Sequence, residues 1–197
     1  VIVTMGAPVN ATQGAITVHT ATINDNDNAP TVEWTTSSQT NDESVTTVTV
    51  TAELSATSGL DVTVPYILTG TASDPADYTI TASPITITAG SLTASATITV
   101  VNDAIDEANE TVIVTMGAPT NAIQGATTVH TATINDNDAA PTVSFTAASQ
   151  SDSENVGTLT VTAELSEVSG QDVTVPFTLS GTAADPADYG ITASPIT

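Results

Sequence analysis

The chain repeats its own sequence with a period of 111 residues, as residues 1–8 recur at 112–119 and residues 74–78 recur at 185–189. The alignment of the two copies needs no gap, and most aligned positions are identical. A period of this length fits one ordinary domain of about 100–150 residues and exceeds the roughly 20–45 residues of a solenoid repeat. The sequence therefore predicts separate domains joined end to end.

The predicted domain boundaries lie where an acidic cluster is followed by a proline, at Pro30 and Pro141. Proline cannot continue a strand ladder, so it favours a break between domains at these points. On this division residues 1–28 are the C-terminal part of one repeat, residues 29–139 are a complete repeat, and residues 140–197 are the N-terminal part of the next. We therefore expect the chain to be a piece of a longer array.

Apolar and polar residues alternate in several segments, which is typical of half-buried strands. Val48, Val50 and Leu54, for example, alternate with threonines and Glu53. The pattern predicts seven strands, near residues 31–36, 45–54, 61–69, 78–88, 92–101, 111–116 and 127–134. Seven strands in one repeat indicate an all-β fold, with tandem immunoglobulin-like antiparallel β-sandwiches of about 111 residues each.

The charge balance restricts the partners of this chain. It contains 22 Asp and Glu residues but no Lys, Arg or Cys. Nucleic acids and anionic membrane surfaces are excluded as partners, because both are bound through basic side chains. Direct membrane insertion is also not expected, since no apolar run approaches about 20 residues. The clustered carboxylates can be compensated only by solvent, salt or bound cations.

The predicted strand order gathers the acidic loops at one end of the domain. If successive strands alternate in direction, the first, third, fifth and seventh all finish at the same pole. Their exits are the acidic segments 41–43, 74–77, 103–110 and 136–138, while the opposite connections carry almost no charge. Oxygen ligands from several loops, without His or Cys, are the donors that Ca²⁺ prefers.

At these loops the sequence resembles the Calx-β domain family. The resemblance rests on Gly70-Thr71-Ala72 followed by Asp77-Tyr78, on segment 101–110, and on the terminal segment 134–138. It implies that the metal ligands of the complete repeat are Glu43, Asp77, Asp103, Glu107, Glu110, Asp136 and Asp138, with Asp106 as a local addition. In the flanking partial repeats it implies Asp25, Asp27, Glu154 and Asp188. Segment 135–138 also resembles the calcium linkers of cadherin repeats, though more weakly.

An enzymatic function is not expected. The two histidines, His19 and His130, occupy equivalent positions in separate repeats, so they cannot form a catalytic arrangement with each other. The clustered carboxylates lie beside the predicted metal site and have no evident substrate cleft.

Two functional hypotheses follow from the repeats and the acidic pole. The first is a calcium-binding structural or adhesive repeat of a secreted or cell-surface protein, forming a stalk or filament whose junctions are made rigid by calcium. Its partners would be adjacent repeats and, in a filament, neighbouring chains. The alternative is a calcium-sensing module, or one that binds a glycan or protein. The near identity of the repeats favours the first hypothesis.

Overall fold

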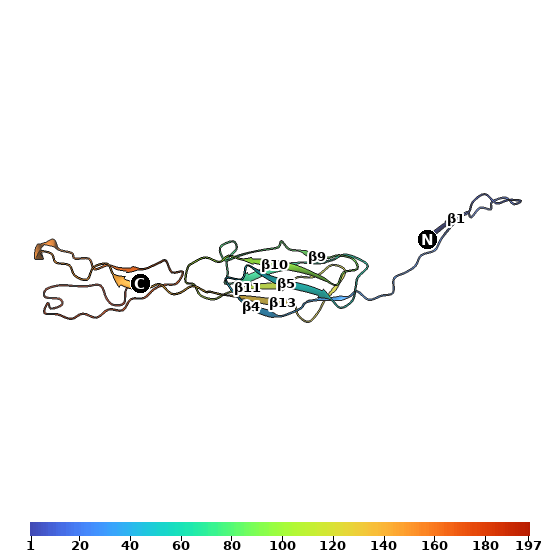
Figure 1. Ribbon diagram of the computed structural model, residues 1–197. Helices are drawn as coiled ribbons and strands as arrows, with labels where there is room; N and C mark the ends of the chain where they lie inside the picture. Colours follow the sequence, from blue (N-terminus) through green and yellow to red (C-terminus); the bar gives the residue numbers. More distant parts are fainter.

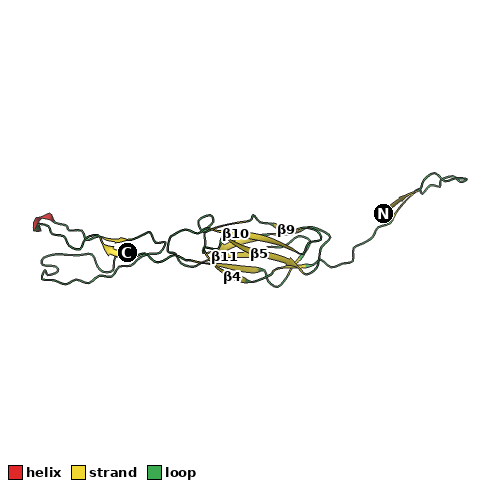
Figure 2. Ribbon diagram, in the orientation of Figure 1, coloured by secondary structure: helices red, strands yellow, loops and turns green.

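The structure is a computed structural model that describes residues 1–197. Figure 1 shows an elongated molecule with a β-sandwich at its centre and the N-terminal and C-terminal segments extending from opposite ends. Strands are the regular elements, apart from one 3-10 helix, η1 (Glu154–Val156), at the far end of the C-terminal segment (Figure 2). The structure contains no helix with the length and apolar character needed to cross a membrane.

Two sheets form the central sandwich. The five-stranded sheet has the order β12-β3-β5-β10-β8 and the four-stranded sheet the order β4-β13-β11-β7, while β6 and β9 pair separately. Their bounds are β3 (Thr31–Trp34), β4 (Ser38–Asp42), β5 (Thr47–Leu54), β6 (Val62–Val64), β7 (Tyr66–Gly70), β8 (Tyr78–Ile80), β9 (Ile85–Ile87), β10 (Thr93–Val100), β11 (Glu110–Met116), β12 (Ile123–Gln124) and β13 (Val129–Asn135).

The hydrophobic core lies between these sheets and contains 20 buried residues. In β5 and β10 every second side chain points inward, so that the apolar residues of the alternating pattern are buried, apart from the half-buried Ala94, and the threonines are exposed or half-buried. Trp34 and Tyr66 meet edge to face in this core, with their ring centroids 6.4 Å apart. Each fully buried aliphatic or aromatic side chain contributes about 1.5–3 kcal/mol, which makes this sandwich the stable part of the chain.

The all-β immunoglobulin-like class is confirmed, but three details differ from the expected strands. The segment 61–69 is divided at Pro65, because β6 pairs with β9 whereas β7 pairs with β11. The segment 78–88 is likewise divided into β8 and β9. Strand β4 was not predicted, and both β4 and β12 pair in parallel, with β13 and β3 respectively.

The sequence repeat is reproduced in the local structure of the two flanking segments. Strands β1 (Ile2–Thr4) and β2 (Val18–Thr20) pair in the register of β11 and β13, so that Ile2 opposes Thr20 as Ile113 opposes Thr131. Strands β14 (Val143–Phe145) and β15 (Ala163–Leu165) likewise repeat the register of β3 and β5. Both hairpins leave large apolar side chains exposed. The exact domain boundaries remain a prediction.

Candidate metal centre

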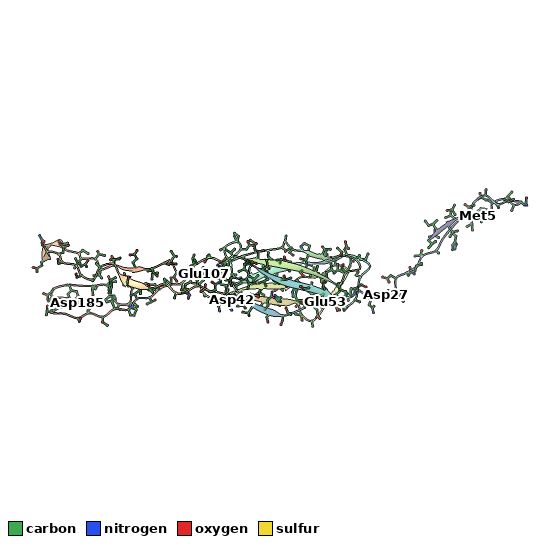
Figure 3. The ribbon with its side chains drawn as sticks, viewed as in Figure 1. Met5, Asp27, Asp42, Glu53, Glu107 and Asp185 are labelled. Carbon is green, nitrogen blue, oxygen red and sulfur yellow. The ribbon has the colours of Figure 1, made fainter.

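Four chain segments bring the acidic residues to one end of the sandwich. Glu43 directly follows β4, Asp77 directly precedes β8, and Asp136 directly follows β13, while the fourth segment is the connection between β10 and β11. Figure 3 shows Asp42 and Glu107 at the end of the sandwich from which the C-terminal segment leaves, whereas Asp27 lies at the opposite end. The expected gathering of acidic loops at one pole is therefore observed.

A small cavity lies between these segments, with a volume of about 20 Å³. This is enough for at least one water-sized sphere. Three of its lining residues are apolar and six are acidic: Val101, Ala108, Ile134, Glu43, Asp77, Asp103, Glu107, Glu110 and Asp136. The cavity therefore places six carboxylates around a space of the size of an ion, and three apolar residues complete its lining.

Glu43 is the most deeply buried of these carboxylates, with 8% of its surface exposed. Its Oε1 accepts a hydrogen bond of 3.0 Å from the main-chain N–H of Asp103. The Asp103 carboxylate in turn accepts a bond of 2.8 Å from the N–H of Ile105, which holds the start of the loop in a turn. Glu43 thus fixes the position of Asp103 and faces the cavity.

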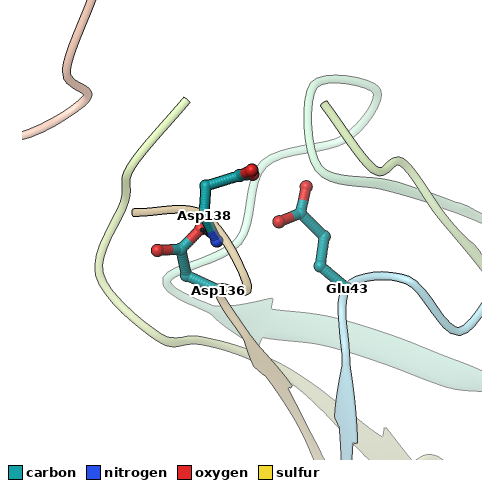
Figure 4. A group of neighbouring side chains, drawn as sticks. All are labelled: Glu43, Asp136 and Asp138. Atoms are coloured by element: carbon teal, nitrogen blue, oxygen red, sulfur yellow. Dashed lines mark hydrogen bonds between the residues drawn. The ribbon is translucent and has the colours of Figure 1, made fainter. Parts of the chain in front are cut away.

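Glu43, Asp136 and Asp138 form a tighter group within this pole. Each offers a carboxylate oxygen, and the three oxygens lie within 4.8 Å of one another. In Figure 4 the carboxylates of Glu43 and Asp138 face each other across a gap, with Asp136 beside them. Asp138 Oδ2 is buried and has no hydrogen-bond partner. A buried carboxylate oxygen without a partner is costly, so this geometry calls for a positive ligand.

The raised pKa values of three carboxylates also indicate that the acidic pole calls for a positive ligand. Burial raises the pKa of Glu110 from 4.5 to about 7, helped by a hydrogen bond and repulsion from Asp77. Burial also raises the pKa of Glu107, with repulsion from Asp77 and Asp103 adding to it. The pKa of Glu43 is raised by burial too, although its hydrogen bond from Asp103 acts in the opposite direction. Without a cation, these carboxylates resist ionisation together.

Two asparagines that were not predicted as site residues hold the acidic segments in place. The side-chain carbonyl of Asn109 accepts a bond of 3.1 Å from the N–H of Asp136, and that of Asn102 accepts one of 2.9 Å from Asn137. They join the loop before β11 to the segment after β13. The presence of amides among the carboxylates of segment 101–110 was the signal that could have identified them.

The structure does not bring all predicted ligands together. Asp106 does not line the cavity, and its carboxylate instead faces Ser169 of the following repeat. Asp25 and Asp27 lie beside the opposite pole, in a hollow near residues 57–60. Glu154 is exposed on η1, and Asp188 accepts a local bond of 2.7 Å from the N–H of Ala184. The assignment of every one of these residues as a ligand remains a prediction.

The donor set at the acidic pole fits Ca²⁺. It offers only oxygen atoms, from flexible carboxylates on four segments, which suits the six to eight ligands at about 2.3–2.6 Å that this ion takes. The pole contains no Cys or His that would favour zinc or copper. The unpartnered oxygen of Asp138 is the atom that most directly calls for such a ligand.

Comparison with known families matches the Calx-beta domain at residues 25–138 and again at 136–196. The chain therefore belongs to the Calx-beta domain family, which confirms the resemblance seen in the sequence. No curated protein matches the chain.

Solved structures give the same fold. The crystal structure of CBD12 from CALX1.2 aligns with a TM-score of 0.51 at 21% identity, over 64% of this chain and 52% of that one. The apo-form Calx CBD1 domain aligns with a TM-score of 0.51 at 18% identity, over 56% of this chain and all of that one. The calcium binding domain CBD12 of CALX1.1 aligns with a TM-score of 0.50 at 22% identity. The aligned part spans about half of the two CBD12 chains.

Proposed function

We propose that this chain is a calcium-binding structural repeat, with the ion held at the acidic pole of each complete domain. The observation that carries the proposal is the cavity lined by six carboxylates, beside a buried and unpartnered oxygen of Asp138. No Lys or Arg exists anywhere in the chain to neutralise them. A divalent cation supplies the missing charge and the missing partner together.

Family membership supports the same ion. One of the similar structures is described as a calcium binding domain. When bound, calcium would neutralise the carboxylates and link the four segments. Glu43, Asp136 and Asp138 are the first candidates to hold it, and Asp77, Asp103, Glu107 and Glu110 complete the donor set.

We further propose that the repeats form a stalk or adhesive filament of a secreted or cell-surface protein. Nearly identical neighbouring repeats suit a long spacer, and a chain without Cys has no disulfides for stability outside the cell. Calcium bound at each junction would supply the stability that disulfides give to other extracellular proteins. The partners are adjacent repeats and, in a filament, neighbouring chains.

Calorimetric titration of the full chain with CaCl₂ tests calcium binding. We expect Asp103→Ala and Glu107→Ala to weaken binding by at least about tenfold, which is about 1.4 kcal/mol. Glu53→Ala is the matched control, because Glu53 lies on an exposed position of β5, far from the pole. Equal effects of the three substitutions would show that the carboxylates attract calcium only through long-range electrostatics, without a specific site.

Small-angle scattering of the same chain tests the stalk. We expect a longer maximum dimension and a narrower distribution in calcium than in chelator, because the short linker 139–141 follows directly after Asp138. If calcium binds but the two profiles coincide, the ion stabilises single domains only. The alternative function, a calcium-sensing or ligand-binding module, would then be preferred.

A further inference from the structure

The acidic loop of the complete repeat contacts the next repeat directly. The N–H of Gly170 donates a hydrogen bond of 3.0 Å to the main-chain carbonyl of Asp106, and an isolated parallel β-bridge joins the two segments at Asp106 and Ser169. The hydroxyl of Ser169 also donates to the Asp106 carboxylate at 3.3 Å. These contacts join one pole of a domain to the opposite pole of its neighbour.

Gly170 lies directly against the side chain of Glu107. A Cβ atom at this position would lie 2.8 Å from Cγ and 2.9 Å from Oε1 of Glu107. The backbone of Gly170 does not have a positive φ, so an alanine here would act through this contact and not through backbone strain. Glu107 lines the acidic cavity, and Gly170 leaves the space that its side chain occupies there, so an added Cβ would force Glu107 to shift.

The complete repeat carries both halves of this contact. Ser58 and Gly59 occupy the positions equivalent to Ser169 and Gly170, and they form the same turn: Ser58 Oγ accepts from Leu60 N–H at 3.0 Å, and Ser169 Oγ from Gln171 N–H at 3.1 Å. A Cβ atom at Gly59 would have no neighbour within 4 Å. This corner nevertheless faces the preceding repeat, since residues 57–60 line a hollow together with Asp25 and Asp27.

We propose that this Ser-Gly corner, residues 58–59 and 169–170, is the docking surface for the acidic loop of the preceding repeat, and that it positions Glu107 in the acidic cavity. The partner is a repeat of this chain type that presents Asp and Glu at the positions of 106 and 107. The two surfaces lie at opposite poles, so the interface is heterologous and extends into an open array. The inference about Glu107 rests on the proposed calcium site.

Asp106 then has a different role from that of the additional metal ligand expected from the sequence. It belongs to the interface between repeats, with both its carbonyl and its carboxylate accepting bonds from the next repeat. Because Glu107 directly follows Asp106 in the sequence, docking of Asp106 also fixes the backbone position of Glu107. The following repeat would thereby influence calcium affinity in the preceding one.

Amide hydrogen exchange of the full chain tests the contact without calcium. The Gly170 amide is bonded across the junction, whereas its counterpart in Gly59 has no such acceptor, so we expect Gly170 to exchange at least about tenfold more slowly. Ser169→Ala should reduce this protection, and Ser58→Ala, which removes only the equivalent turn bond, should leave it unchanged. Equal exchange of the two glycine amides would overturn the proposal.

Calcium titration of Gly170→Ala and Gly59→Ala tests the link to the site. We expect Gly170→Ala to weaken binding about three- to tenfold by displacing Glu107, and Gly59→Ala to bind as the unaltered chain does. Equal affinities would overturn the positioning of Glu107. If the unaltered chain does not bind calcium, the proposed function fails, while protection of the Gly170 amide still decides the docking surface.

Discussion

Glu43 Oε1 accepts a hydrogen bond of 3.0 Å from the main-chain N–H of Asp103, which lies 60 positions further along the chain. Glu43 follows β4 of the four-stranded sheet, and Asp103 follows β10 of the other sheet. The bond therefore ties the two sheets together at the acidic pole. Glu43 has two separable properties, its charge and its acceptor oxygen.

Glu43→Gln should separate these properties, because glutamine keeps the acceptor but removes the charge. We expect it to weaken calcium binding at least about tenfold, while the calcium-free protein keeps or increases its stability as repulsion falls. Glu43→Ala should also destabilise the calcium-free protein, by about 1–3 kcal/mol, since the Asp103 N–H loses its acceptor. Titration and chemical denaturation measure both effects, and identical behaviour of the two variants would contradict the structural role of the bond.

Calcium should raise the melting temperature of the chain. An ion that binds only the folded state stabilises it by about 2.7 kcal/mol at a hundredfold excess over its dissociation constant. Calorimetric melting with calcium and with chelator measures this difference, and sodium chloride at equal ionic strength controls for screening. The same midpoint in calcium and chelator would mean that the acidic pole does not hold the ion.

The stability of the calcium-free protein should decrease as the pH rises. The pKa of Glu110 is raised to about 7 in the folded state, from 4.5, so between these values the folded chain binds more protons than the unfolded chain. Stability present below about pH 4.5 is then lost as the pH rises through about 7.

Denaturation at pH 5 and pH 8 in calcium-free buffer checks this direction, and Glu110→Gln should reduce the difference. Calcium reverses the trend, because it binds the ionised carboxylates and its affinity increases with pH. A calcium-free protein that is more stable at pH 8 than at pH 5 would be inconsistent with the raised pKa.

Gly70→Ala should destabilise the sandwich more than Gly181→Ala, its counterpart in the next repeat. Both glycines have a positive φ, 128° and 135°, so both substitutions introduce backbone strain of about 1–3 kcal/mol. Only at Gly70 would the added Cβ also overlap the carbonyl of Thr111, whereas nothing lies within 4 Å at Gly181. Thermal melting of the sandwich compares the two variants, and because Gly181 lies outside the sandwich, equal losses would contradict the steric role of the Thr111 carbonyl at Gly70.

The acidic pole was predictable from the sequence because it depends on strand direction alone. The loops that contain Asp77, Asp103 and Asp136 each follow or precede strands with clear alternation, so a count of strands was enough to place them at one end. The core residues were predictable for the same reason.

The features that were missed depend on contacts between distant segments. Strand β4 is polar, with only its alternate residues half-buried, and its parallel pairing with β13 leaves no local signal. The position of Asp106 is set by Ser169, which belongs to another repeat. No pattern within one repeat could distinguish an acidic residue at the junction from one that lines the cavity.

The parallel pairing of β4 with β13 has a mechanical consequence. Five residue pairs join them, from Ser38 with Thr131 to Asn41 with Ile134 and Asp42 with Asn135. Tension along the chain pulls the beginning of β4 and the end of β13 in opposite directions, so these pairs are loaded together in shear and cannot open one at a time. The Glu43 N–H bond of 2.8 Å to Asn135 continues the ladder up to the carboxylates. An ion bound between Glu43 and Asp136 would cross-link the ends of β4 and β13 and so resist their separation. Force spectroscopy should therefore find a higher unfolding force in calcium than in chelator.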